Sequence, residues 1–166
     1  LGALGHVDTI FNHISCCWMD SSSKHHLTMN AGGLLAQESD PKNLRTIELD
    51  DPRWSKATPE GVNPDGFRLH ISIHRQRRRD GVAIHTHSTY ASAVANTTQG
   101  LMPLSQAALE FYGHLGVLEY GGLFRESGMS AEVRTLAEQG GVLLLRNHGL
   151  LVVADEVAEA VYLTHF

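Results

Sequence analysis

The segment Gly81-Val82-Ala83-Ile84-His85-Thr86-His87-Ser88 contains an apolar run followed by two histidines that one residue separates. The run follows the turn-forming pair Asp80-Gly81 and is typical of a short buried strand. Alternate side chains of a strand project from the same face. We therefore expect His85 and His87 to point the same way, close enough to bind a single metal ion.

A second apolar run, Leu143 to Leu145, is followed by Arg146-Asn147-His148-Gly149. It predicts another buried strand, which ends just before a histidine. We expect the fold to bring His148 to the first two histidines. Three neutral imidazoles would leave coordination positions of a metal ion open, as catalytic rather than structural sites require.

The composition excludes several classes of protein. With 166 residues, 42% hydrophobic and 19% charged, the chain fits a soluble globular protein of one domain. Its formal net charge of −5 gives no reason to expect a nucleic acid or a membrane surface as partner. No apolar run approaches the roughly 18 residues of a membrane-spanning helix. The two cysteines, Cys16 and Cys17, are adjacent and poorly placed to pair, which favours a reducing, cytoplasmic setting.

Apolar periodicity and turn signals predict alternating strands and helices along the rest of the chain. Strands are expected over residues 10–19, 27–29, 44–49, 115–120, 142–145 and 150–154. Helices are expected over residues 67–78, 89–96, 105–112 and 130–139, and from a capping Asp155 to Phe166. We expect Arg77, Arg78 and Arg79 to form a solvated helix end, where positive charge complements the helix dipole. Because the chain opens without a leader and stops inside a helix, we expect one domain over residues 1–166, cut from a longer protein.

Five segments carry a resemblance to a known protein family. In chain order they are Phe11–Ser15, Asn63–His70, His85–Ser88, Leu101–Gln106 and Arg146–Leu150. In this order and spacing the set resembles the class II aldolase/adducin family over nearly the whole chain. The resemblance implies an α/β fold, a three-layer α/β/α sandwich with a central, mostly antiparallel sheet. It also implies a homo-oligomer, often a tetramer whose active site lies near a subunit interface.

The same resemblance assigns metal ligands. In enzymes of the family, the equivalents of His85, His87 and His148 bind one divalent metal ion per chain. We expect zinc or Fe(II), with manganese or cobalt as further choices. A small-molecule substrate could chelate the ion through a carbonyl and a neighbouring hydroxyl or carboxylate, and the ion would act as a Lewis acid.

The sequence departs from the sugar-phosphate aldolases of this family. Those enzymes carry a Ser-Ser-Glu segment whose glutamate is the acid/base, and Pro64, Asp65 and Gly66 stand at its three positions. Likewise, His13 stands at the position of an asparagine that helps to bind phosphate. Proline offers no donor and an aspartate repels phosphate, so we expect a non-phosphorylated substrate. This pattern resembles the adducin-like branch of the family.

Several polar residues near these motifs are candidates for the site. The candidate catalytic groups in place of the missing glutamate are Asp65, Tyr112 and His114. The candidate substrate-binding residues are Asn12, His13, Ser15 and Glu110. His13 is equally suited to satisfy a neighbour in the sheet. We expect His70 and His74, four residues apart on one helix face, to lie behind the metal ligands or at the core edge.

Three functions remain open. The first is a metal-dependent lyase of class II aldolase type, which cleaves a C–C bond beside the carbonyl of a non-phosphorylated compound or 2-oxo acid. The second is a non-haem Fe(II) oxygenase that oxidatively shortens a 2-oxo acid, as related proteins do in aminocoumarin biosynthesis. The third is an adducin-like interaction module without catalysis. The intact histidines count against the third function, and the missing Ser-Ser-Glu segment leaves the first two close.

Overall fold

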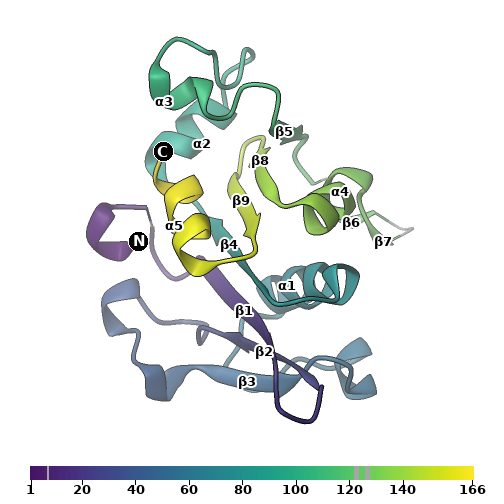
Figure 1. Cartoon of the computed structure of the whole chain (residues 1–166). Coiled ribbons are helices and arrows are strands. Elements are labelled where there is room, and N and C mark those ends of the chain that lie inside the picture. The colour runs from purple at the N-terminus through teal and green to yellow at the C-terminus, as the bar shows by residue number, and fades with distance from the viewer. Residues whose placement is uncertain (7, 122–123, 126–127) are drawn as a thin grey trace.

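A computed structural model describes residues 1–6, 8–121, 124–125 and 128–166, and its main feature is a seven-stranded sheet (Figure 1). The strands are β1 (His13–Met19), β2 (His25–Met29), β3 (Arg45–Glu48), β4 (Gly81–Thr86), β5 (Leu115–Leu118), β8 (Gly141–Leu145) and β9 (Gly149–Ala154). Across the sheet their order is β3-β2-β1-β4-β9-β8-β5. Neighbouring strands of this sheet are antiparallel, apart from the parallel pair β5 and β8. Two short strands, β6 (Phe124–Arg125) and β7 (Gly128–Met129), pair with each other.

Helices cover both faces of the sheet (Figure 1). On one face lie α1 (Pro64–Arg77) and α4 (Ala131–Gln139); on the other lie α2 (Thr89–Ala95) and α5 (Val157–His165). The remaining helical segments are α3 (Gln106–Leu109), η1 (Gly2–Leu4), η2 (Ala36–Glu38), η3 (Pro41–Asn43) and η4 (Pro52–Ser55). The predicted three-layer α/β/α sandwich with a mostly antiparallel sheet is therefore confirmed. Within the described ranges, no helix combines the length and the apolar character needed to cross a membrane.

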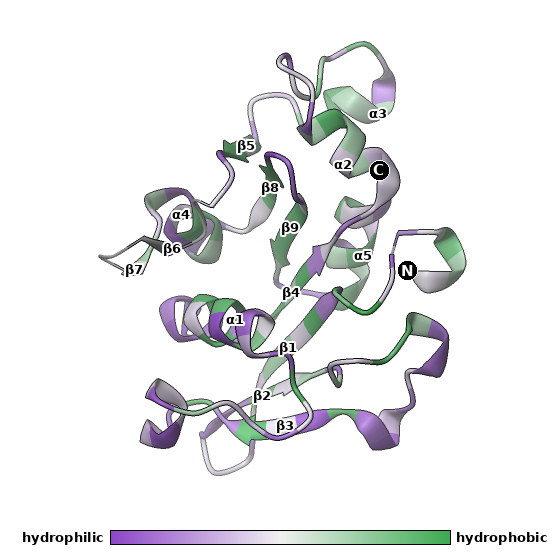
Figure 2. Ribbon diagram, turned by 180° about the vertical axis from the view of Figure 1, so that it is seen from behind, coloured by the Kyte–Doolittle hydropathy of each residue, from purple (hydrophilic) through white to green (hydrophobic). Residues whose placement is uncertain are grey.

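Two apolar cores flank the sheet, because β4, β8 and β9 are buried on both faces. The core beneath α1 and α4 contains Leu69, Ile73, Ala83, Val133, Leu136, Ala137, Leu143, Leu145, Leu151 and Val153. The core beneath α2 and α5 contains Val82, Ile84, Ala95, Val142, Leu144, Leu150, Val152 and Ala160. Figure 2 shows β8 and β9 as largely hydrophobic ribbons between the two helical layers. Because successive side chains of a strand point to opposite faces of the sheet, each of these strands contributes apolar side chains to both cores.

The adjacent cysteines of β1 also follow this alternation. Cys16 packs against the core beneath α2 and α5, whereas Cys17 lies in a third apolar cluster with Phe67 and Ile71 of α1. Both are free thiols.

The first helix, α1, begins at Pro64 rather than at Phe67. Its start is fixed by Asn63, whose side-chain oxygen accepts hydrogen bonds of 3.0 Å from the backbone N–H groups of Asp65 and Gly66. Proline suits the first helical position because the N–H that it lacks would have no partner there. Asp65 and Gly66 consequently lie in the first turn of a helix rather than in a loop.

The prediction of a solvated helix end is wrong for Arg77. Its side chain is buried, donates a hydrogen bond of 3.0 Å to the carbonyl oxygen of Ala137 in α4, and pairs with Asp155. Asp155 also accepts a hydrogen bond from Arg79. The prediction that Asp155 caps α5 is wrong, because Glu156 stands at the N-cap position and makes no side-chain hydrogen bond there. Arg77 therefore ties α1 to α4 and to the start of α5.

We predict that Arg77→Ala lowers the free energy of unfolding by about 1–3 kcal/mol, because a buried carbonyl of Ala137 loses its donor. As a control, Arg78→Ala removes an ion pair with Asp50 in which both side chains are about half exposed. That loss should be below about 1 kcal/mol. Urea titrations followed by circular dichroism measure both values, and equal losses would contradict the structural role of Arg77.

Candidate metal centre

The first two histidines of the candidate site come from the end of β4. His85 lies within the strand and His87 follows it directly. Their Nε2 atoms are 3.1 Å apart, and their ring centroids are 4.8 Å apart. Zinc–imidazole bonds of about 2.0–2.1 Å place two nitrogens that share a tetrahedral ion roughly 3–3.5 Å apart. The spacing of this pair therefore suits a shared ion.

The third histidine, His148, comes from the turn between β8 and β9. Because β9 pairs antiparallel with β4, this turn lies beside the end of β4. Gly149 permits the close approach, since a Cβ atom there would overlap the carbonyl oxygen of Thr86. The His148 ring lies 4.8 Å from that of His85 and 4.9 Å from that of His87, between centroids. The possible ligand atoms of all three lie within 4.8 Å of one another.

Neighbouring groups orient two of these rings. The Nδ1 atom of His85 lies 2.9 Å from the carbonyl oxygen of Leu150, which can only accept, so Nδ1 carries the proton and Nε2 is left for a metal. The Nδ1 atom of His87 lies 3.4 Å from a carboxylate oxygen of Asp8. The backbone N–H of His87 donates to the side-chain oxygen of Asn12 at 3.1 Å. Outer contacts of this kind fix the ring orientation of metal-binding histidines.

Burial keeps two members of the cluster uncharged. It lowers the pKa of His85 well below the usual 6.5, and the nearby His148 and His87 add to the shift. Burial, followed by the proximity of His87, also lowers the pKa of His148. Since metals bind the neutral imidazole, these two histidines are in a metal-binding form at neutral pH. The residues present therefore fit one divalent ion with nitrogen ligands.

The three histidines line a cavity of about 480 Å³. Its other described lining residues are Phe11, His13, Asn63, Asp65, Gly66, Arg68, Leu69, Tyr120 and Gly121. Asp65, in the first turn of α1, is the one carboxylate among these described residues. Of the seven residues named as catalytic or substrate-binding candidates, His13 and Asp65 lie at the cavity.

His13 forms an inner wall of this cavity and is 7% exposed. Its ring stacks on that of His85, with centroids 5.7 Å apart and an interplanar angle of 23°. Burial, and then the proximity of His87, lowers the pKa of His13 to about 4. A Cβ atom at Gly66 would lie 2.6 Å from the His13 ring. The position where the family resemblance places a glutamate is thus filled by an imidazole from β1.

Behind His13 lies a buried polar network around Ser15. The Ser15 hydroxyl lies 2.6 Å from Nδ1 of His70 and 2.8 Å from Nε2 of His74, and both rings are fully buried. Burial lowers the pKa of His70 well below 6.5 and that of His74 to about 3. The expectation that His70 and His74 lie behind the metal ligands agrees with this placement. Ser15 contacts these histidines rather than the cavity.

The structure does not bring the other candidates to the cavity of the same chain. Tyr112 is largely exposed and lines a hollow beside α3, while His114 lines hollows near α4 and β8. Glu110 is exposed in the turn after α3. Conversely, sequence reasoning missed Tyr120 and Asp8. Neither belongs to a motif, and only the folded chain brings Asp8 to His87.

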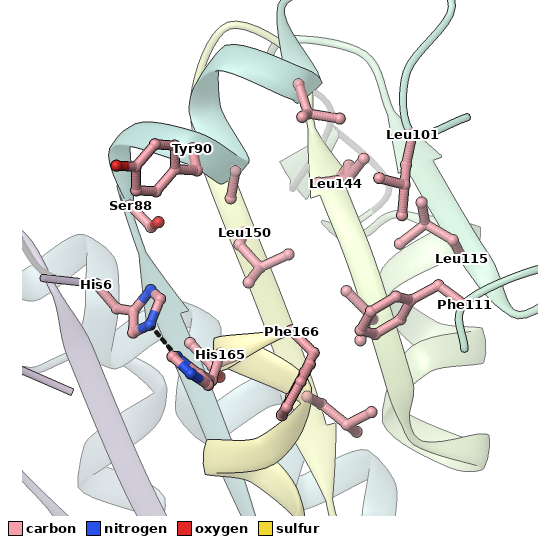
Figure 3. Close-up of a pocket in the computed structure, with 15 residues that line it drawn as sticks. His6, Ser88, Tyr90, Leu101, Phe111, Leu115, Leu144, Leu150, His165 and Phe166 are labelled. Carbon is pink, nitrogen blue, oxygen red and sulfur yellow. Dashed lines mark hydrogen bonds between the residues drawn. The ribbon is translucent and has the colours of Figure 1, made fainter. Parts of the chain in front are cut away.

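A second cavity, of about 150 Å³, lies between α2, α5 and the sheet (Figure 3). Its walls are mainly apolar, as Leu144, Leu150 and Phe111 illustrate. At its edge, ring nitrogens of His6 and His165 lie 2.7 Å apart. Its described lining residues include no carboxylate and only these two histidines, so it offers no three-ligand metal site. The chemistry of the site accordingly belongs to the larger cavity.

Comparison with known proteins matches residues 1–166 to the family model described as the class II aldolase and adducin N-terminal domain. A protein of Caulobacter vibrioides named "Putative aldolase class 2 protein" is 32% identical over 157 residues, which are 93% of this chain and 59% of that one. Alpha-adducin of Rattus norvegicus is 31% identical over 163 residues, which are 97% of this chain and 22% of that one.

The fold has a similarly clear match among solved structures. An aldolase II superfamily protein from Pseudomonas syringae superposes with a TM-score of 0.76 at 32% sequence identity. The match covers 96% of this chain and 64% of that one. The chain thus spans less than two thirds of the length of each of these relatives.

We predict that the protein binds about one equivalent of Zn²⁺ or Co²⁺ per chain and that His87→Ala loses this binding. The physical reason is that two remaining imidazoles hold a divalent ion far more weakly than three. Elemental analysis after gel filtration measures the content, and His25→Ala, a substitution on β2, is the matched control. Equal metal content in wild type and His87→Ala would remove the assignment.

We also predict that stability falls as the pH drops from 7 to 5. His70 and His74 stay neutral in the fold but take up protons in the unfolded chain below about pH 6.5, so acid favours unfolding. Each imidazole contributes on the order of 2 kcal/mol to this loss at pH 5. In urea titrations at several pH values, His74→Gln should show a shallower pH dependence. Ser72→Ala, which leaves both imidazoles in place, should keep the wild-type dependence.

Proposed function

The chain belongs to the class II aldolase and adducin family, and on this premise we propose that it is a metal-dependent lyase for a small, non-phosphorylated carbonyl compound or 2-oxo acid. The observation that carries the proposal is the cluster of His85, His87 and His148 at one cavity. A bound divalent ion would supply Lewis acidity, which stabilises negative charge on a carbonyl oxygen while an adjacent C–C bond breaks. Zinc or Fe(II) is the proposed metal.

The cavity supports a lyase because it also contains a group that can carry a proton. Among the described residues that line the cavity, Asp65 is the carboxylate; it lies on the first turn of α1, next to the histidine cluster. A carboxylate in that place can exchange a proton with a substrate bound at the metal. We therefore propose Asp65 as the acid/base in place of the glutamate that position 66 lacks.

Charge in the cavity bears on the substrate class. Asp65 places a negative charge in the cavity and disfavours a phosphate dianion next to its carboxylate, although Arg68 adds a positive charge to the same lining. Pro64, next to it, has no N–H to donate. A substrate that chelates the metal through a carbonyl and a hydroxyl avoids this repulsion, and one with a single carboxylate experiences less of it than a phosphate dianion.

If Tyr112 takes part in the reaction, we propose that it does so in the cavity of a second copy of the chain. Its side chain is 69% exposed and lies away from the cavity of its own chain. In a homo-oligomer, as the family resemblance implies, this exposed ring could reach a neighbouring cavity.

An adducin-like interaction module is the second candidate function. The similarity to rat alpha-adducin over 97% of this chain favours it. A module of that kind has no use for three histidines whose rings converge, two of them with their outer nitrogens oriented by neighbouring groups. A protein that binds no metal and turns over no substrate would be explained by this second function.

We predict that the metal-loaded protein cleaves at least one member of a panel of 2-oxo acids and hydroxycarbonyl compounds in the absence of oxygen. Product aldehyde, pyruvate or CO₂ is measured, with phosphorylated analogues as poorer substrates. Asp65→Asn should keep its metal and lose about 10²–10⁴ in turnover, because general acid–base help is removed. The control Glu60→Gln changes an exposed carboxylate outside the cavity.

Turnover that requires oxygen and Fe(II) would contradict the lyase and identify an oxygenase instead. Full activity of Asp65→Asn would contradict the role of this carboxylate while leaving the metal site intact.

A further inference from the structure

We propose that His13 and Gly66 are a matched pair that forms a substrate-binding subsite beside the metal centre. The missing side chain at position 66 admits the His13 ring, and this ring binds a hydroxyl or carbonyl oxygen of the substrate beyond its metal-chelating atoms. The inference rests on the proposed function, because it assumes that a small molecule binds at the three histidines.

The first line of support is the shared space. Gly66 lies in the first turn of α1, and His13 begins β1. A Cβ atom built at Gly66 would lie 2.6–2.7 Å from Cγ, Cδ2 and Nδ1 of the His13 ring. Real Cβ atoms do not approach other atoms so closely. The ring therefore occupies volume that any other residue at position 66 would need.

The second line of support is how the ring is held. His13 pairs with His85 across β1 and β4 and stacks on its ring. On its other side the His70 ring meets it nearly edge-on, with centroids 6.1 Å apart and an interplanar angle of 81°. His70 is fixed in turn by the Ser15 hydroxyl at 2.6 Å. Packing alone thus sets the direction of the His13 nitrogens.

The third line of support is that both nitrogens of His13 are buried without a hydrogen-bond partner among the described residues. Leaving a buried polar atom unpaired costs about 1–3 kcal/mol, so native proteins seldom tolerate it without a ligand or water. The ring lines the same cavity as the three histidines. A ligand bound against the ring would supply the missing partner.

The chemistry of the ring indicates what it binds. An imidazole forms one hydrogen bond per nitrogen. This suits a single hydroxyl or carbonyl oxygen, whereas a phosphate group takes several donors at once. The subsite therefore favours a substrate with a further oxygen beyond the chelating pair.

Two probes test this directly. Glycerate and lactate share the carboxylate and 2-hydroxyl that can chelate a metal, but only glycerate has a 3-hydroxyl. The Co²⁺-loaded protein is titrated with each, and binding is followed through the visible absorption of the cobalt. We expect the wild type to prefer glycerate by about three- to tenfold, the worth of one hydrogen bond. His13→Ala and Gly66→Ala should lose the preference while keeping full cobalt content.

Unchanged preference for glycerate in cobalt-loaded His13→Ala, or no preference in the cobalt-loaded wild type, would overturn the subsite. Failure of the wild type to bind cobalt at all would instead overturn the proposed function and the subsite with it. The outcomes of the two proposals are thereby distinguishable.

Thermal unfolding tests the shared space without metal or probe. Alanine normally stabilises a helix relative to glycine, so Gly66→Ala would raise the melting temperature if nothing hindered the new Cβ atom. We expect a decrease, because the new Cβ meets His13, and we expect the double variant Gly66→Ala/His13→Ala to recover part of the loss relative to His13→Ala. An increase in the melting temperature of Gly66→Ala would refute the pairing.

Discussion

The antiparallel pairing of β4 with β9 is the constraint on which the candidate site depends. It brings the turn before β9 alongside the end of β4, and so brings His148 to His85 and His87. The pairing is secured by apolar side chains on both faces of β4 and β9, which sit in two separate cores. Side chains at the ends of central strands are held more rigidly than side chains on long loops. Arg146, beside His148, adds hydrogen bonds to the carbonyl oxygens of Ala95, Thr97 and Thr98.

Buried imidazoles extend from this cluster into the protein. His13 lies against His85, His70 meets His13, and the Ser15 hydroxyl joins His70 to His74. Such an arrangement costs desolvation at every ring and is tolerated when the groups bond one another or a ligand. The inner end of the series bonds Ser15, whereas the outer end faces the cavity. The series therefore converges on the place where a substrate would meet the metal.

One fold in this family serves both aldolase-named proteins and adducins, so the fold does not decide the function of this chain. The function of this chain has to be argued from its site. His85 and His87 have their outer nitrogens directed to Leu150 and Asp8, and the cavity holds Asp65. An interaction surface has no need of oriented ligands inside a cavity. These features favour chemistry over scaffolding.

The sequence by itself determined the α/β class, most elements and the three metal-binding candidates. Strand periodicity is visible locally along the chain, and His85, His87 and His148 lie in short motifs that can be read without the fold. It could not place His13 against Gly66 or Ser15 between two histidines, since these contacts join residues more than 50 positions apart. It also left Arg77 on the surface, because a charge run reveals nothing about which guanidinium a neighbouring helix will bury. Only tertiary packing decided those partners, for burial and hydrogen bonding depend on what lies across the fold rather than along the chain.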